Sequence, residues 1–140
     1  GTEQLHPRLR GHEQIALHEK TDIRDVVLAG DASGKVVLED TPDIIVIDVS
    51  FVSLREILPH IAGLAGRDTV IIAMVKPQFE AGRDQVSKGI IKNDAVRRQI
   101  LRDFEVWTKQ YFVISDKADS EVAGSRGNRE RFYVLHRARI

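Results

Sequence analysis

The sequence predicts an α/β fold in which helices pack on the faces of a sheet. Short continuous apolar runs alternate along the chain with stretches whose apolar residues recur at helical spacing, a pattern typical of this class. The runs within 44–49 and 70–75 are unbroken aliphatic tracts, which indicates parallel strands buried on both faces. The chain has 140 residues, 42% hydrophobic and 30% charged, so we expect a single domain over 1–140 and exclude a disordered or collagen-like protein.

The elements follow one another in a regular order. Residues 30–43, which contain glycine, serine and proline, are predicted to form a turn or short hairpin. Ser53 is positioned to cap a helix that Pro59 makes short or kinked. A longer amphipathic helix begins near Asn93 or Asp94. Strands are predicted at 14–18, 44–49, 70–75, 111–115 and 132–136.

Composition narrows the class of protein further. The chain has no cysteine, so it has no disulfides or thiolate metal sites, and we expect it in a reducing cytoplasm. No apolar run approaches the roughly 18 to 20 residues of a membrane span, and the five histidines show no metal-ligand spacing, so we expect neither a membrane partner nor a metal. The net charge is zero, but residues 1–75 hold 7 basic and 12 acidic side chains and residues 76–140 hold 14 and 9. The basic half suits a polyanion such as RNA, and equally a solvated surface.

Charged residues follow the two secure strands where a ligand site is expected. In open parallel sheets, ligands bind beyond the carboxyl ends of the strands. Asp48 closes one aliphatic run and Lys76 follows the other. If the last strand is antiparallel to these, Glu130 lies at the same edge. Each residue also has a structural interpretation: Asp48 as a helix cap, Lys76 as a surface charge, and Glu130 as the partner of an adjacent arginine.

Four motifs resemble a known family. They are DVSFVSL at 48–54, VKPQFEAGR at 75–83, VSKG at 86–89 and GNRERF at 127–132. Their order and spacing resemble the TlyA family of FtsJ-like RNA 2′-O-methyltransferases, also called haemolysins. The resemblance implies a Rossmann-like class I methyltransferase sheet, S-adenosylmethionine as the methyl donor, and the ribose 2′-hydroxyl of a cytidine in ribosomal RNA as the acceptor.

The resemblance also implies roles for particular residues. Asp48, Lys76 and Glu130 match the second, third and fourth members of a Lys-Asp-Lys-Glu catalytic tetrad. Lys76 would take the hydroxyl proton, Asp48 would orient Lys76 and the methyl donor, and Glu130 would hold the hydroxyl. Asp22, within EKTDIR at 19–24, matches a position that meets the adenine of the cofactor, although a helix or turn cap is an alternative.

Basic residues around the same edge are the candidates for RNA contact. Phosphate contacts from such side chains position a target ribose without reading its sequence. Each of them is also interpretable as a solvated charge. The candidates are Arg83, Lys88, Lys92, Arg126 and Arg129.

The resemblance is to the later part of the methyltransferase domain. It implies that the glycine-rich cofactor loop, the first two strands, the first tetrad lysine and an N-terminal RNA-binding domain precede Gly1. Residues 30–34 do not replace that loop, because they follow no clear strand and open no helix. The strand expected at 14–18 would lack its neighbours, and could pair elsewhere, fray, or swap between two chains as a homodimer. Residues 120–126 also lack the proline-rich segment usual before the last motif.

Three other functions compete with methyl transfer. An inactive RNA-binding fragment or pseudoenzyme is consistent with the absence of the glycine-rich loop. A membrane-active cytolysin is disfavoured, because no segment combines a strong apolar face with a lysine-rich one. A different α/β enzyme, such as a hydrolase using Asp48, lacks a serine nucleophile elbow or phosphate loop.

Overall fold

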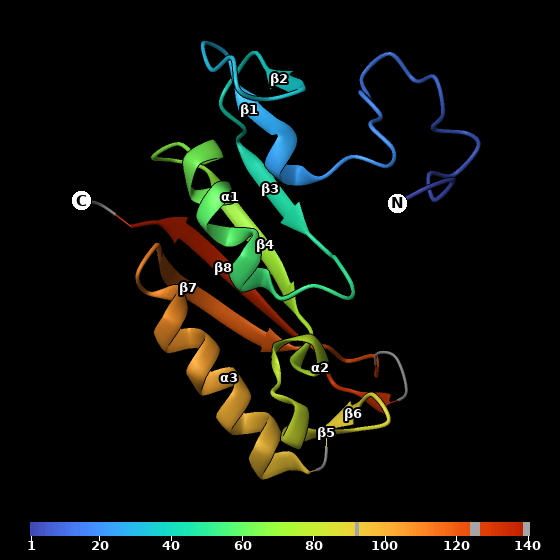
Figure 1. Cartoon of the computed structure of the whole chain (residues 1–140). Coiled ribbons are helices and arrows are strands. Elements are labelled where there is room, and N and C mark those ends of the chain that lie inside the picture. Colours follow the sequence, from blue (N-terminus) through green and yellow to red (C-terminus); the bar gives the residue numbers. More distant parts are fainter. Residues whose placement is uncertain (92, 124–126, 139–140) are drawn as a thin grey trace. The chain divides into compact units, whose positions relative to one another are not determined.

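The computed structural model describes residues 1–91, 93–123 and 127–138. The chain divides into two compact units, Gly1–Glu39 and Asp40–Ile140. Figure 1 shows the elements of both units along the chain. The expectation of one domain over the whole length stays a prediction, and each unit is described separately.

The first unit contains a small parallel sheet. The 3₁₀ turn η1 (Ile23–Asp25) leads into β1 (Val26–Leu28), which pairs in parallel with β2 (Val36–Leu38). Of the turn or short hairpin expected within 30–43, the hairpin is wrong, because it would make these strands antiparallel, whereas a turn does follow β1 at 29–30. Gly34 allows the arrangement: a Cβ atom there would lie 2.5 Å from the Val27 side chain.

The prediction of a strand at 14–18 is also wrong. Residues 15–18 have no regular secondary structure, and the amide of Ile15 donates to the carbonyl of His12 in a local turn. Ile15 and Leu17 are exposed, so the alternating pattern does not correspond to a buried face. A strand needs a partner, and within the described ranges none pairs with this segment. It therefore offers no strand edge for the expected homodimer, which stays a prediction.

The second unit is built on a mixed four-stranded sheet. Its strands are β3 (Ile44–Ile47), β4 (Val70–Val75), β8 (Arg131–Arg137) and β7 (Phe112–Asp119), in the order β3-β4-β8-β7. β3 and β4 are parallel, whereas β8 is antiparallel to both of its neighbours. In Figure 1 the arrows of β3, β4 and β7 accordingly run one way and β8 runs back. Four of the five predicted strands and the α/β class are confirmed.

Both predicted caps are confirmed, but Ser53 starts a 3₁₀ turn and not an α-helix. Ser53 Oγ accepts a hydrogen bond from the amide of Arg55 at 3.1 Å, which starts the 3₁₀ turn η2 (Leu54–Glu56). The short helix α1 (Leu58–Leu64) follows, with proline in its first turn, where proline is tolerated. Asn93 Oδ1 accepts from the amide of Val96 at 2.9 Å and starts α3 (Asp94–Thr108).

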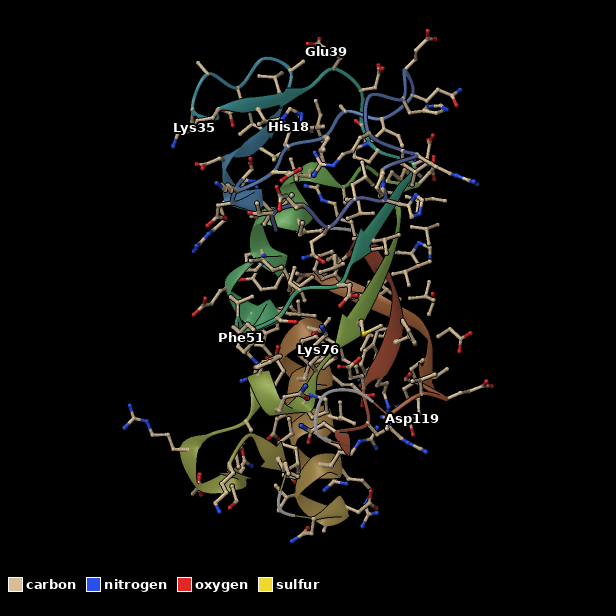
Figure 2. All side chains as sticks on the ribbon, turned by 90° about the vertical axis from the view of Figure 1, so that its right-hand side faces the viewer. His18, Lys35, Glu39, Phe51, Lys76 and Asp119 are labelled. Carbon is tan, nitrogen blue, oxygen red and sulfur yellow. The ribbon has the colours of Figure 1, made fainter. Side chains whose placement is uncertain are left out.

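The core of this unit lies between one face of the sheet and the two longer helices. Figures 1 and 2 show α1 and α3 on the same side of the sheet. On this side the fully buried side chains include Leu58, Ile61, Ile71, Leu101, Phe104, Phe112, Tyr133 and Leu135. The expectation that β3 is buried on both faces is wrong, since Ile44 is 62% and Val46 70% exposed. β3 is the edge strand of the described sheet, and α1 and α3 lie on one side of that sheet.

Short elements surround the end of the sheet where β4 ends and β8 begins. They are α2 (Pro77–Glu80), the 3₁₀ turn η3 (Arg83–Gln85), and the hairpin of β5 (Val86–Ser87) and β6 (Ile90–Ile91). Figure 1 shows α2, β5 and β6 gathered at this end. Over the described residues, every helix is too short or too polar to cross a bilayer.

Candidate active site

The two parallel strands bring Asp48 and Lys76 together. Asp48 follows β3 directly, and Lys76 follows β4 and caps α2. Lys76 Nζ lies 2.8 Å from Asp48 Oδ1, a charge-assisted contact across the edge of the sheet. Figure 2 shows Lys76 where the β4 ribbon ends. The pair forms as the strand-end argument predicted.

The pair is asymmetric in its access to water. The Lys76 side chain is only 13% exposed, whereas that of Asp48 is 60% exposed. Lys76 Nζ also donates to Ser50 Oγ at 2.9 Å. Ser50 was not predicted as a site residue. The signal was available, because residues two apart on an extended chain point to the same side.

Glu130 approaches the same edge from the antiparallel strand. The register of β4 and β8 pairs Val75 with Arg131, so its continuation places Glu130 opposite Lys76. Opposed residues of an antiparallel pair point to the same face. Glu130 is buried, and its carbonyl accepts from the amide of Ser120 at 2.8 Å. No ion pair joins the side chains of Glu130 and Lys76, both of which belong to the described part of the chain.

The contacts of these residues differ from those that the structural interpretations expect. Ser53 caps η2, so Asp48 is not that cap. Lys76 is mostly buried and paired, unlike a solvated surface charge. Arg131 forms an ion pair with Asp119 at 2.8 Å. The guanidinium of Arg131 is therefore directed to Asp119 and not to Glu130.

Phe51 is an exposed aromatic residue beside this pair. Its side chain is 91% exposed and its φ is +64°, a backbone conformation that bulky residues rarely adopt. The ring contacts that of Phe79, with centroids 5.2 Å apart. Aromatic faces of this kind stack unpaired bases in RNA-binding proteins. Sequence reasoning missed Phe51, and its positive φ has no signature in the residue type.

Glu80 joins the two loops that carry the pair. It accepts hydrogen bonds from Ser53 Oγ at 2.5 Å and from the amide of Leu54 at 2.7 Å. Burial raises the pKa of Glu80, and the two hydrogen bonds from Ser53 and Leu54 act against that rise. The carboxylate thus links the end of α2 to the start of η2.

Asn128 joins the β5–β6 hairpin to the entry of β8. Asn128 is buried, with an exposed fraction of 5%. Oδ1 accepts from the amide of Ile91 at 3.1 Å, and Nδ2 donates to the carbonyl of Gly89 at 2.9 Å. The hairpin is therefore fixed two residues before Glu130.

A charged network joins the end of β7, which precedes Glu130 in the chain, to the start of β8, which follows it. Asp119 Oδ1 accepts from Arg97 and from Arg131, both at 2.8 Å. The hydrogen bond from Arg131, together with Arg97, lowers the pKa of Asp119 to about 2 although burial opposes this. Arg97 also donates to the carbonyl of Arg129 at 3.1 Å. The backbone on both sides of Glu130 is consequently restrained.

The predicted cofactor residue Asp22 lies in the first unit. Its Oδ1 accepts from the amide of Arg24 at 2.9 Å and caps η1, and its Oδ2 lies 2.8 Å from Arg24 Nη2. The alternative interpretation as a turn cap therefore holds, and a cofactor contact stays a prediction.

The RNA-contact candidates fall into two groups. Lys88 is at the exposed tip of the β5–β6 hairpin, Arg83 begins η3, and Arg129 precedes Glu130; all three are exposed. Lys92 and Arg126 lie outside the described residues. A hollow of about 370 Å³ is bordered by Arg129, Asn128, Arg97 and the start of α3. In residues 1–91, 93–123 and 127–138, no cluster of three or more His, Cys, Asp or Glu side chains could hold a metal ion.

Comparison with known proteins identifies the family. Residues 1–138 match the FtsJ-like methyltransferase family. The chain belongs to this family. Its relatives include TlyA proteins, which confirms the resemblance drawn from the four motifs.

Two curated relatives and one solved structure illustrate the similarity. The chain is 36% identical over 136 residues to the 23S rRNA (cytidine-2′-O)-methyltransferase TlyA of Campylobacter jejuni, which covers 95% of this chain and 49% of that protein. It is 39% identical over 94 residues to the 16S/23S rRNA (cytidine-2′-O)-methyltransferase TlyA of Mycobacterium tuberculosis, covering 67% of this chain and 32% of that protein. The structure described as "Putative hemolysin from Streptococcus thermophilus" superimposes with a TM-score of 0.85 at 30% identity, over 98% of this chain and 48% of that one. The chain thus spans about half the length of the curated C. jejuni relative.

Proposed function

We propose that this chain carries the catalytic residues of an S-adenosylmethionine-dependent methyltransferase that modifies a ribose 2′-hydroxyl of ribosomal RNA in the cytoplasm. The observation that carries the proposal is the Asp48–Lys76 contact at 2.8 Å, with Glu130 opposite Lys76 in the sheet register. Family membership supports the reaction type, and the cytidine methyltransferase relatives support the acceptor. The sheet would then be the later part of a Rossmann-like class I methyltransferase domain.

Asp48 suits a positively charged methyl donor. When bound, S-adenosylmethionine supplies a methyl group made electrophilic by its sulfonium. The exposed carboxylate of Asp48, at the carboxyl end of β3, complements a positive charge at this edge. Residues 30–34 join β1 to β2 and so do not form a strand-to-helix cofactor turn. In this proposal Asp48 would hold the sulfonium end of the donor, and Asp22 would be the residue that contacts the adenine.

Lys76 is placed to act as the general base. Its nitrogen has two acceptors, Asp48 and Ser50, which fix its direction. In the pair with Asp48 the lysine is an ammonium, so it would have to release one proton before acting as a base, and the positive charge of the bound donor would favour that release. The resulting neutral amine could donate to both acceptors and keep its lone pair for the proton of a ribose hydroxyl. That proton passes to Nζ as the oxygen becomes nucleophilic. General base assistance of this kind is worth about 10²- to 10⁴-fold.

The surrounding residues would position the acceptor strand. Glu130 would accept a hydrogen bond from the ribose, and Phe51 offers a face for a base. Arg83, Lys88 and Arg129 would contact phosphates, together with Lys92 and Arg126.

The direct test is Lys76→Ala in the full-length protein. Methyl transfer to ribosomal RNA should fall by about 10²- to 10⁴-fold, the contribution of a general base. Calorimetry should show nearly unchanged affinity for S-adenosylmethionine. Lys109→Ala, which changes an exposed lysine at the end of α3, is the matched control. Turnover retained in Lys76→Ala would refute the role, and RNA binding without donor binding in the unmodified protein would instead indicate an RNA-binding pseudoenzyme.

A further inference from the structure

Two loops that follow neighbouring strands are joined side chain to side chain. One is residues 48–53, after β3, and the other is residues 76–80, after β4. Several contacts between them involve Lys76 or another residue of the proposed site. The contacts are Asp48 with Lys76, Ser50 with Lys76, Phe51 with Phe79, and Ser53 with Glu80.

Glu80 makes the contact that is farthest from the strands. It holds both Ser53 Oγ and the amide of Leu54, so one carboxylate fixes a side chain and the backbone next to it. Glu80 ends α2, a single-turn helix that begins with the fully buried Pro77. Glu80 thus connects α2 to the far end of the first loop.

The first loop needs this connection. Phe51 has a φ of +64°, which costs conformational energy in a residue with a bulky side chain. The ring of Phe51 is 91% exposed and so adds little packing of its own. The loop is therefore held at its start by β3 and at its end by Ser53 and Leu54. If the far end were released, the backbone at Phe51 could relax and carry Asp48 and Ser50 with it.

We propose that Glu80 is a positioning residue of the methyl-transfer site. By holding Ser53 and Leu54 it keeps Asp48 and Ser50 at hydrogen-bonding distance from Lys76 Nζ. The inference rests on the proposed function for its catalytic consequence, but the geometric consequence can be observed without any reaction.

The test compares three substitutions at carboxylates. Glu80→Ala removes both acceptors. Glu80→Gln retains the shape, and its amide can accept from Leu54 and donate to Ser53 Oγ. Glu56→Gln is the matched control, because Glu56 is an exposed carboxylate on η2 itself. Ser53→Ala removes one of the two contacts of Glu80, together with the cap on the amide of Arg55, and provides a second variant if Glu80→Ala does not fold.

The geometric readout is the NMR signal of the Lys76 ammonium in the full chain labelled with ¹⁵N-lysine. Hydrogen bonds to Asp48 and Ser50 should slow exchange of these protons with water, and loss of the signal in Lys76→Ala assigns it. We expect the signal to broaden or vanish in Glu80→Ala, to weaken in Ser53→Ala, and to persist in Glu80→Gln and Glu56→Gln. An unchanged signal in Glu80→Ala or in Ser53→Ala would overturn the proposal.

The catalytic readout is the separation of kcat from KM in the full-length protein. Glu80→Ala should lower kcat by about 10- to 100-fold, since a displacement of about 1 Å at a reacting group can cost about 10²-fold. KM for RNA should change less than twofold, and Glu80→Gln should restore most of kcat. The effect should disappear in a Lys76→Ala background, because Glu80 acts through Lys76. If the unmodified protein transfers no methyl group, the proposed function fails, and the NMR signal alone still decides the role of Glu80.

Discussion

The network around Asp119 predicts a specific dependence of stability on pH. Asp119 Oδ1 accepts from Arg97 and Arg131, whose side chains are only 12% and 19% exposed. These contacts lower the pKa of Asp119 from its usual 3.8 to about 2. Because a tenfold change in proton affinity is worth about 1.36 kcal/mol, the ionised form gains at most about 2.4 kcal/mol. The Asp119 side chain is 36% exposed, so solvent screening reduces this to about 1 kcal/mol.

The sign follows from the direction of the pKa change. A carboxyl with a lowered pKa stabilises the folded state above pH 4, and the contribution is lost as the pH falls toward 2. Asp119→Asn removes the charge but keeps an oxygen that can accept from both arginines. We therefore expect the variant to be about 1 kcal/mol less stable than the unmodified chain at pH 6 and nearly equal to it at pH 2.

Urea unfolding followed by circular dichroism at pH 6, 4 and 2 measures this difference. Asp103→Asn is the control, because Asp103 is an exposed carboxylate on α3. It should leave the free energy of unfolding within about 0.5 kcal/mol at every pH. A difference between Asp119→Asn and the unmodified chain that stays constant from pH 6 to pH 2 would refute the electrostatic explanation.

Three further predictions concern the loops around the site. Asn128→Ala leaves the amide of Ile91 without the acceptor Asn128 Oδ1, so the free energy of unfolding should fall by about 1 to 3 kcal/mol. Hydrogen exchange at the Ile91 amide should accelerate, and unchanged exchange would contradict the role of Asn128. If a base stacks on the exposed ring, Phe51→Ala should weaken RNA binding by about 1 to 3 kcal/mol in a filter-binding assay, while the thermal midpoint of unfolding stays unchanged. An unaltered Kd would exclude stacking. Lys88→Ala should lower the slope of log K against log salt by about 0.7 to 0.9 if this lysine neutralises one phosphate, whereas an equal slope would place Lys88 outside the RNA interface.

Local signals in the sequence predicted the elements but not their surroundings. The aliphatic runs of β3 and β4 and the Asn93 cap of α3 are properties of neighbouring residues, and all three are confirmed. Whether a strand is covered on both faces depends on distant segments, which is why Ile44 and Val46 were wrongly expected to be buried. Residues 14–18 fail for a related reason, since β propensity without a partner strand does not make a sheet.

The candidate site shows the same division between local and distant information. Asp48 and Lys76 were found because the ends of parallel strands meet at one edge. Glu80 was missed because its partner is remote in sequence. Ser53 and Glu56 match the spacing of a local capping box, in which Glu56 would accept from the amide of Ser53, yet the carboxylate bound to the start of η2 is that of Glu80. A cap supplied from another loop has no signature in the spacing.

The asymmetry of the Asp48–Lys76 pair decides which substitution reports chemistry rather than folding. Removing one member of a buried pair is costly when the remaining charge stays in a poorly solvated position. Asp48→Ala would leave the ammonium of Lys76, only 13% exposed, with Ser50 as its acceptor in the structure. Lys76→Ala would instead leave a carboxylate that is 60% exposed and readily solvated. Loss of turnover in Lys76→Ala therefore reflects the missing amine, whereas loss in Asp48→Ala would combine a chemical and a structural effect.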